Sequence, residues 1–243
     1  MVFRCVIFDC DSTLSRIEGI EALAGEHHAE IARLTGAAMR GEVRLEEVYG
    51  RRLALVRPSR ERLEALGREY ITELVPDARE TVAALRAEGI DVRVLSGGLR
   101  PAVLVLTRAL GLGDDAVAAV DVFFDAAGGY AGWDVASPLA RAGGKAEVIA
   151  AWRPAVPRPT LLVGDGATDL EARPAVDAFV AFAGVAERAA VVAGADAVIR
   201  IPSLAPVLPL VRGTIALGVG GAAGAKPSAA APPRASSSSR RIR

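Results

Sequence analysis

Cysteine is scarce in this chain, which has only 2 cysteines, Cys5 and Cys10, among 243 residues. So few thiols cannot form a disulfide framework of the kind that reinforces small secreted domains. Cys10 stands at the end of an apolar run, where we expect a small core residue rather than a reactive thiol. The cysteine content therefore favours a reducing compartment, and we expect a cytoplasmic protein.

An excess of charge of either sign is also missing. The chain has 29 Lys and Arg residues against 29 Asp and Glu residues, which gives a formal net charge of zero. Binding to nucleic acid depends on accumulated positive charge that neutralises the phosphates. The balance argues against a general binder of nucleic acids or other polyanions, and we expect no nucleic-acid partner.

Long uninterrupted apolar runs are absent as well. The most apolar late segment, residues 207–219, contains Pro209 and Arg212 and is shorter than the ~20 residues that span a bilayer. Residues 1–8 lead directly into an apolar run, without the charged region and separate apolar segment of a secretory signal. We therefore expect neither a membrane anchor nor an export signal.

Two carboxylates stand one residue apart where the first apolar run ends. Ile7 and Phe8 precede Asp9, and Asp11 follows after Cys10. Side chains alternate along a strand, so Asp9 and Asp11 would face the same side, beyond the carboxyl end of the strand. Like charges this close need a cation, and Mg²⁺ is usually held by one or two carboxylates together with a substrate phosphate. The pattern predicts a Mg²⁺ site that acts on a phosphate.

Three further motifs follow at later apolar runs and loops. Ser96, Gly97 and Gly98 offer a hydroxyl and unobstructed backbone amides to phosphate oxygens. Lys145 follows two glycines and provides a compact positive charge for a phosphate or an aspartate. Asp165 ends another apolar run and would complete the metal site.

Each of these motifs by itself is also common in turns that carry no chemistry. Their order along one chain, with a nucleophile, a hydroxyl, a lysine and then acidic residues, is what carries the argument. His27 and His28 do not add to it, because neighbours on a helix diverge by about 100° and do not grip one metal as an i, i+4 pair does.

In this order the motifs resemble those of the haloacid-dehalogenase-like phosphatases, and the chain is similar to one branch of them, the phosphoserine phosphatase family. The resemblance covers residues 3–203 and extends to segments between the motifs, namely residues 18–20, 52–55, 58–61, 130–132 and 177–179. Four motifs in the family's order, with family-like sequence between them, are far more specific than any one of them.

The resemblance implies a mechanism. Asp9 would attack phosphorus and form an aspartyl-phosphate, and Asp11 would protonate the leaving alkoxide and then activate water. Mg²⁺ would be held by Asp9, by the backbone carbonyl of Asp11 and by Asp165, with Asp169 in a supporting position. The phosphate would be bound by Ser96, Gly97, Gly98, Lys145 and Thr168.

The resemblance also implies a small helical cap. Residues 16–75 are rich in Glu, Arg, Ala and Leu, and their apolar residues recur at helical spacing. Glu18 and Arg52 stand at the family's positions for the ammonium and carboxylate of phosphoserine, although most charged residues in such a region only face water. Met39 matches a further substrate-side position. Three residues depart from close relatives, since Arg40 replaces a glycine and Leu45 and Leu99 replace phenylalanines.

Apolar runs that alternate with helical segments predict an α/β fold, a doubly wound parallel sheet with its active site at the carboxyl ends of the strands. We expect strands at residues 4–8, 92–95, 160–163, 178–183 and 197–201. Residues 1–15 and 76–217 would form the core and residues 16–75 the inserted cap. Residues 218–243, rich in Gly, Ala, Pro and Ser, are expected to be a disordered tail.

Three functions are compatible with these residues. The first is Mg²⁺-dependent hydrolysis of O-phospho-L-serine, the last step of serine biosynthesis, by a monomer or a homodimer. The second is a related phosphatase or phosphotransferase for another small phosphate ester, which the departures at Arg40, Leu45 and Leu99 leave open. The third is a catalytically silent module that binds a phosphorylated metabolite. The third is disfavoured because binding alone does not require both a nucleophile and an acid.

Overall fold

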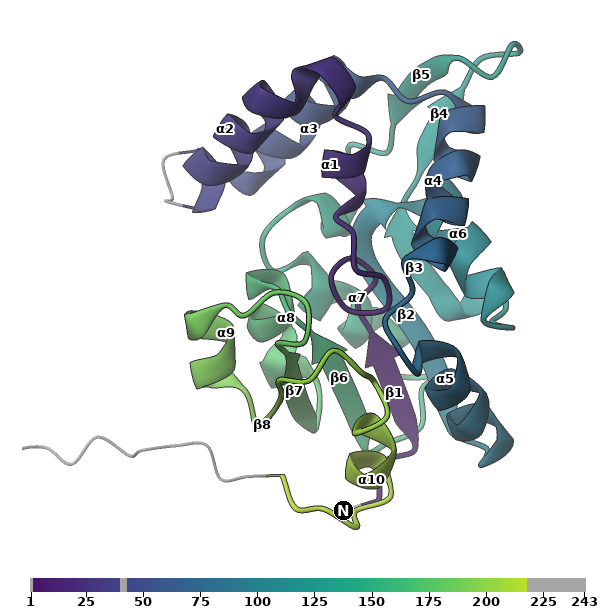
Figure 1. The fold of residues 1–243 in the computed structure, drawn as a ribbon, viewed down its shortest axis with the longest axis vertical. Helices are drawn as coiled ribbons and strands as arrows, with labels where there is room; N and C mark the ends of the chain where they lie inside the picture. The colour runs from purple at the N-terminus through teal and green to yellow at the C-terminus, as the bar shows by residue number, and fades with distance from the viewer. Residues whose placement is uncertain (1, 40–42, 218–243) are drawn as a thin grey trace, which may run out of the picture.

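A 6-stranded parallel sheet forms the centre of the molecule, with the strand order β3-β2-β1-β6-β7-β8 (Figure 1). The computed structural model describes residues 2–39 and 43–217, and the side chains of residues 36–39 and 45 are outside that description. The strands are β1 (Cys5–Phe8), β2 (Asp91–Leu99), β3 (Val117–Val120), β6 (Thr160–Gly164), β7 (Ala178–Phe182) and β8 (Ala197–Ile199). A separate antiparallel hairpin consists of β4 (Val122–Phe124) and β5 (Tyr130–Trp133).

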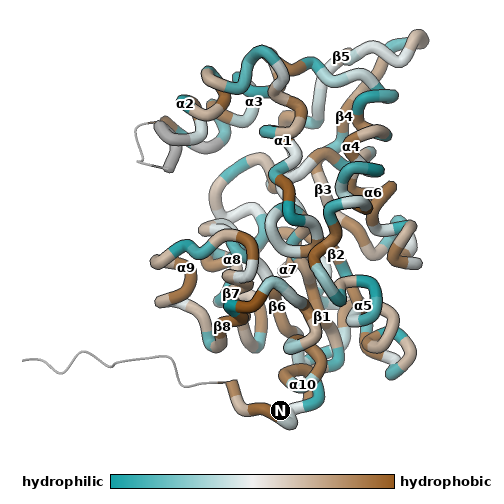
Figure 2. Tube along the Cα trace, viewed as in Figure 1, coloured by the Kyte–Doolittle hydropathy of each residue, from teal (hydrophilic) through white to brown (hydrophobic). Residues whose placement is uncertain are grey.

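The central strands are short apolar sequences that are buried on both faces. Every residue of β1, β6 and β7 is buried, although neighbouring side chains of a strand point to opposite faces. Both faces must therefore be covered, as expected for a parallel sheet flanked by helices. The hydropathy colouring shows the same strands as the hydrophobic centre (Figure 2).

Helices connect the strands and surround the sheet. Their bounds are α1 (Gly19–Ala22), α2 (His28–Met39), α3 (Leu45–Val56), α4 (Arg60–Thr72), α5 (Ala78–Ala87), α6 (Arg100–Ala109), α7 (Gly144–Trp152), α8 (Ala167–Ala172), α9 (Ala189–Gly194) and α10 (Val207–Val211). None of these described helices is both long and apolar enough to cross a membrane.

The predicted insert does not lie in one place. Helices α1, α2 and α3 lie beyond the carboxyl ends of the strands, whereas α4 runs alongside α6 (Figure 1). Ser59 caps α4 by accepting a hydrogen bond from the Arg62 amide at 3.2 Å. Gly67 permits close approach to α6, because a Cβ at this position would lie 2.4 Å from the Cβ of Val105. The insert is thus anchored to the core through α4.

The order of the strands creates a crevice beside β1. The chain passes outward from β1 to β2 and β3 and then returns to β6 on the other side of β1. A ligand site is expected at this reversal, outside the carboxyl ends of β1 and β6. The amide of Asp9 donates to the carbonyl of Val163 at 2.9 Å, which brings the two strand ends into register.

The last helix closes the fold onto the first strand. The amide of Phe3 donates to the carbonyl of Val211 in α10 at 2.9 Å, and the next amide, that of Arg4, donates to the carbonyl of Pro159 at 2.8 Å. The entry to β1 is therefore held by two segments that lie more than 150 residues later in the sequence, at Pro159 and Val211. The predicted tail lies outside the described residues.

The structure confirms the doubly wound α/β fold and places a strand at each of the predicted positions, with two differences. Strand β3 at the sheet edge was not predicted. The strand predicted at residues 92–95 is longer than expected and continues through Ser96–Gly98 to Leu99. The pairing of β2 with β3 breaks register between Leu95 and Leu99, the part of the strand that contains Ser96.

Candidate active site

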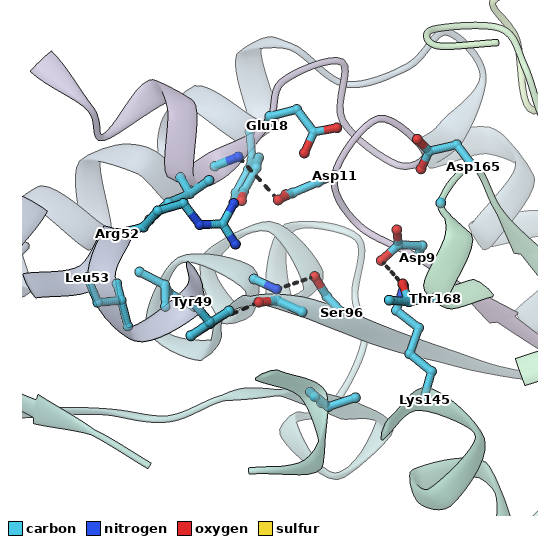
Figure 3. A pocket seen from close by; sticks show the side chains of 18 of the residues that line it. Asp9, Asp11, Glu18, Tyr49, Arg52, Leu53, Ser96, Lys145, Asp165 and Thr168 are labelled. Carbon is cyan, nitrogen blue, oxygen red and sulfur yellow. Dashed lines mark hydrogen bonds and ion pairs between the residues drawn. The ribbon is translucent and has the colours of Figure 1, made fainter. Parts of the chain in front are cut away.

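A cavity of about 220 Å³ lies at the crevice between the strand ends and helices α1 and α3. Most of the residues predicted for the site line it (Figure 3). They are Asp9, Asp11, Glu18, Arg52, Ser96, Gly97, Gly98, Lys145, Asp165 and Thr168. Asp169 is buried beside this cavity, and the Met39 side chain lies outside the described residues, as does Arg40.

Three carboxylates meet at the ends of β1 and β6. Asp9, Asp165 and Asp169 are buried, and each places an oxygen within 4.8 Å of the oxygens of the other two. Lys145 from α7 contacts two of them, since its Nζ lies 2.8 Å from Asp9 Oδ1 and 2.7 Å from Asp169 Oδ1. Burial alone would lower the pKa of Lys145, but the two carboxylates outweigh it and raise the pKa. The lysine therefore stays positively charged.

The carboxylate cluster fits a hard divalent cation. Asp9 and Asp165 present oxygen donors at the wall of the cavity, the ligand type that Mg²⁺ takes. Asp169 is fully buried and does not line the cavity, and it accepts from Lys145 and, at 3.0 Å, from the amide of Gly166. These contacts agree with a supporting position for Asp169 behind the ligands.

Asp165 has further partners that the motifs did not reveal. The hydroxyl of Thr13 donates to Asp165 Oδ1 at 3.1 Å, and the guanidinium of Arg188 pairs with Asp165 Oδ2. Arg188 also reaches Glu18 Oε1 at 3.3 Å, and Ser12 donates to the same Glu18 oxygen at 2.7 Å. One arginine from the loop after β7 thus joins the proposed metal site to the proposed ammonium site.

Asp11 faces α1 and α4 rather than the three-carboxylate cluster. Its Oδ2 accepts from the amide of Gly19 at 3.2 Å, while its buried Oδ1 has no hydrogen-bond partner. Burial, together with the charge of Glu18, raises the pKa of Asp11 to about 7, although the nearby Tyr70 hydroxyl lowers it in part. A carboxyl group with this pKa holds its proton part of the time near neutral pH, as a general acid requires.

Backbone and hydroxyl groups gather on the β2 side of the cavity. Ser96 is buried, and its Oγ accepts from the amide of Gly98 at 2.9 Å. Gly97 packs against the carbonyl of Leu139, where a Cβ would lie at 3.3 Å. Lys145 lies on the same side of the site, so a phosphate here would meet a hydroxyl, backbone amides and an ammonium group.

Arg52 extends from α3 into the cavity, facing the strand ends (Figure 3). Its Nη1 makes a long contact of 3.5 Å with the hydroxyl of Thr35, and its buried Nε has no partner. Burial lowers the pKa of Arg52.

Orphaned polar atoms concentrate in this cavity. In the described part of the chain, four buried side-chain polar atoms lack a hydrogen-bond partner, and three of them belong to Asp11, Arg52 and Tyr70. All three residues line the cavity. Buried polar groups without partners are costly and uncommon, so their concentration here indicates a polar ligand.

Gly144 precedes Lys145 and yields a steric prediction. A Cβ at Gly144 would lie 1.7 Å from the carbonyl oxygen of Pro138, so Gly144→Ala must displace backbone at the start of α7. We expect a loss of roughly 2–3 kcal/mol in the free energy of unfolding, seen as a lower Tm in calorimetry. Gly50→Ala is the matched control, because its Cβ would meet Trp133 at an ordinary 3.6 Å within α3. Equal Tm values for the two variants would contradict the steric argument.

Sequence reasoning missed Tyr49, Tyr70, Thr13 and Arg188. Tyr49 lies three residues before Arg52 in a predicted helix, so their common face was a usable signal. Tyr70 falls on the apolar face of α4, where helical spacing reads it as a core residue. Arg188 follows β7 in a loop with no motif, and only the folded sheet brings it to Asp165.

Comparison with known proteins agrees with this geometry. A family model described as haloacid dehalogenase-like hydrolase matches residues 3–177. The chain is 38% identical over 182 residues to phosphoserine phosphatase of Bos taurus, covering 74% of this chain and 81% of the relative. It is 39% identical over 199 residues to the chloroplastic phosphoserine phosphatase of Arabidopsis thaliana, covering 79% and 67%. A solved phospho-aspartyl intermediate analogue of phosphoserine phosphatase superposes with a TM-score of 0.71 at 26% identity, covering 87% of this chain and all of that one.

Proposed function

The chain belongs to the haloacid dehalogenase-like hydrolases, within the phosphoserine phosphatase family, and from this premise we propose that it hydrolyses O-phospho-L-serine to L-serine and phosphate. The resemblance inferred from the motifs is confirmed, as is the assignment to an enzyme family. The reaction would be the last step of serine biosynthesis.

One observation carries the choice of substrate. A single cavity is lined by Arg52, with its unpartnered Nε, and by Glu18, as well as by Asp9, Ser96 and Lys145. Phosphoserine carries a carboxylate, an ammonium group and a phosphate on a short skeleton. The arginine suits the carboxylate, the glutamate suits the ammonium group, and Ser96 with Lys145 suits the phosphate.

Asp9 forms the covalent intermediate. Lys145 holds one carboxylate oxygen of Asp9 at 2.8 Å and leaves the other for attack on phosphorus. As the bond from Asp9 to phosphorus forms, the bond from phosphorus to the serine oxygen breaks. Ser96, Gly97, Gly98 and Thr168 line the space in which the phosphate oxygens would lie.

Asp11 moves the proton in both half-reactions. In its protonated form it gives its proton to the departing serine alkoxide. As a carboxylate it then takes a proton from the water that attacks the aspartyl-phosphate, which restores Asp9 and releases phosphate. The raised pKa of Asp11, about 7, suits a group that must serve in both protonation states.

The proposed cofactor is Mg²⁺. Asp9, Asp165 and the backbone carbonyl of Asp11 would hold it, and Asp169 would orient Lys145 from behind. When bound, the cation supplies positive charge that neutralises the phosphate and the developing charge of the transfer. The protein itself contributes Lys145 to the same task, and Arg188 balances the charge of Asp165.

The remaining predictions stay part of this proposal. Residues 16–75 act as the cap that selects the substrate, and residues 1–15 and 76–217 act as the catalytic core.

The protein works in the cytoplasm, although one relative is named chloroplastic, and a homodimer is the expected alternative to a monomer. Light scattering after gel filtration measures the number of subunits directly.

The second candidate function is hydrolysis of another small phosphate ester, or transfer of the phosphoryl group from Asp9 to an acceptor other than water. Leu99, one of the departures from close relatives, is buried and lines the cavity, so it alters the apolar wall that a substrate meets. The silent binding module is not favoured, because Asp9, Asp11 and Lys145 meet in one cavity.

The decisive measurement is phosphate release from a panel of esters, with Mg²⁺ and with EDTA. We expect hydrolysis of phosphoserine to exceed that of phosphoethanolamine by at least ~10-fold in kcat/KM, since phosphoethanolamine lacks the carboxylate that Arg52 would bind. We expect EDTA to abolish release. Equal rates for phosphoserine, phosphoethanolamine and an aryl phosphate would favour the second function, and rates that EDTA does not affect would remove the metal from the proposal.

A further inference from the structure

Tyr49 contacts both halves of the candidate site but belongs to none of the motifs. It lies in α3, is buried, and lines the cavity together with Arg52 from the same helix. Its hydroxyl donates a hydrogen bond of 2.9 Å to the carbonyl of Gly97 on β2. This bond therefore joins the helix that carries the proposed carboxylate site to the strand that carries the proposed phosphate site.

The accepting peptide is held from two directions. The peptide group between Gly97 and Gly98 presents its carbonyl to the Tyr49 hydroxyl, and its amide donates to Ser96 Oγ at 2.9 Å. Glycines leave a backbone free to rotate, so a Ser-Gly-Gly segment needs such bonds to keep one orientation. The Tyr49 hydroxyl thus fixes the peptide plane beside the proposed phosphate site.

The position of the Arg52 guanidinium also depends on Tyr49. Residues three apart on a helix are neighbours, and the guanidinium carbon of Arg52 lies 5.9 Å from the centre of the Tyr49 ring. Among the residues that the structure describes, the long contact with Thr35 is the only side-chain hydrogen bond of Arg52. The ring of Tyr49 is therefore one of the few features that define where the guanidinium sits.

Trp133 also packs against the Tyr49 ring. It extends from β5, and its ring centre lies 5.0 Å from that of Tyr49 at an angle of 50°. Gly50, the next residue of α3, leaves room for this contact, because even a Cβ there would be 3.6 Å from Trp133. The Tyr49 ring thus contacts both Trp133 of the hairpin and Arg52, and its hydroxyl bonds to β2.

We propose that Tyr49 is a positioning residue that sets the distance between the carboxylate-binding Arg52 and the phosphate-binding segment at Gly97, and so determines which phosphate esters fit. This inference rests on the proposed function, since it assumes that one substrate reaches both groups. The affinity of an ester that binds only through its phosphate does not depend on this distance. The affinity of phosphoserine does, because its carboxylate and its phosphate bind at the two ends.

The hydroxyl can act as a donor over the whole working range. Burial raises the pKa of Tyr49, so the phenol stays protonated at neutral and mildly alkaline pH. A carbonyl can only accept, so the bond to Gly97 requires this proton.

The test is Tyr49→Phe, which removes one oxygen and keeps the ring. We expect KM for phosphoserine to rise roughly 5-fold with kcat nearly unchanged, which is the size of one net hydrogen bond lost from ground state and transition state alike. For phosphoethanolamine, kcat/KM should change less than ~2-fold, because no carboxylate reaches Arg52. In an Arg52→Gln background, Tyr49→Phe should have no further effect on phosphoserine, because the two residues act as one unit.

Two other variants separate positioning from loss of structure. Tyr130 lies in β5, as Trp133 does, but does not line the cavity. Tyr130→Phe should therefore leave kcat/KM unchanged for both phosphoserine and phosphoethanolamine. Trp133→Leu removes the support of the Tyr49 ring and should reproduce the selective rise in KM. Tm is measured for each variant, so a fall in activity from unfolding is recognised.

The outcomes distinguish this inference from the proposed function. If the wild-type enzyme prefers phosphoserine and Tyr49→Phe does too, with unchanged KM, the positioning role is wrong. Equal losses on both esters would also overturn it, because they would indicate an effect on the phosphate segment or on the fold alone. If the wild-type enzyme shows no preference for phosphoserine over phosphoethanolamine, the proposed function fails first and the inference with it.

Discussion

Asp9→Asn should reduce phosphate release from phosphoserine by at least ~10⁴-fold, because an amide cannot attack phosphorus and no other group stands in its place. The substitution keeps the shape of the side chain and an oxygen that can face Lys145, whose Nζ lies 2.8 Å from Asp9 Oδ1. The folded site should therefore persist, and the loss should lie in kcat. Rapid quenching with labelled phosphoserine should trap phosphorylated protein from the wild type and none from Asp9→Asn.

The control for this variant is Asp115→Asn, at an exposed aspartate that does not line the cavity. It should retain full activity and the same Tm as the wild type. Calorimetric titration of Asp9→Asn with phosphoserine checks that the binding site survives. Residual activity within ~10-fold of the wild type would show that another residue is the nucleophile.

Asp11→Asn should lower kcat by ~10²–10⁴-fold, the range typical of a lost general acid and base. An asparagine keeps the hydrogen bond that Asp11 Oδ2 accepts from Gly19 at 3.2 Å, but it has no proton to give the leaving alkoxide. An aryl phosphate, whose leaving group needs no proton, should be affected less in the first half-reaction. A loss that is equal for phosphoserine and the aryl phosphate would assign Asp11 a role other than the acid.

The same variant should be more stable than the wild type at alkaline pH without divalent metal. The pKa of Asp11 rises from 3.8 to about 7 on folding, mainly because the carboxyl group is buried. Below pH 3.8 both states hold the proton, and between these values the unfolded chain ionises first, so folding stability falls as the pH rises. Above pH 7 the folded protein carries a buried charge that asparagine lacks.

Differential scanning calorimetry in EDTA tests whether Asp11→Asn is more stable than the wild type at alkaline pH. The Tm of Asp11→Asn should exceed that of the wild type by at least roughly 2–4 °C at pH 8, which is about 1 kcal/mol for a chain of this size. The difference should shrink toward pH 4.5. A variant less stable than the wild type at pH 8 would mean that the charge of Asp11 is stabilised by its surroundings. In that case the ionised Asp11 carboxylate, which the reaction requires, would not lower the stability of the folded protein.

The sequence predicted the parts of the site that depend on local pattern. Asp9, Asp11 and Asp165 follow apolar runs, and parallel strands bring their carboxyl ends to one edge, so their meeting could be expected from order alone. Lys145 was identified from its motif, whereas Glu18 and Arg52 were placed by resemblance to a family, and all three line the cavity. Their chemical roles remain predictions that the variants above address.

Other parts of the site depend on contacts that no local pattern records. Ser96 was identified from its motif, but the break in register between its strand and β3 was not, and an edge strand as short as Val117–Val120 leaves little trace in the sequence. Arg188 reaches Asp165 and Glu18 from a loop, so its role follows from the fold alone. Tyr49 was accessible in principle, because it shares a helical face with Arg52.

The placement of α4 shows a further limit. Periodicity predicts a helix there correctly, but it does not show which surface that helix packs on. The side of α4 that contains Gly67 meets α6 at a distance that only a residue without Cβ permits. Which surface a helix packs on is decided by such close approaches, and these become visible only when both partners are in place.

The position of β1 has a consequence for how the protein is made. This strand precedes the other strands of the sheet in the sequence, yet it lies between β2 and β6, and its entry is bonded to Pro159 and Val211. A ribosome-bound nascent chain that has not reached β6 cannot pair both edges of β1 or assemble Asp9 with Asp165. One edge of this apolar strand therefore stays unpaired until β6 has been made, and unpaired edges of this kind favour aggregation during folding. Catalytic competence would then appear only after Lys145, Asp165 and Arg188 have all been synthesised.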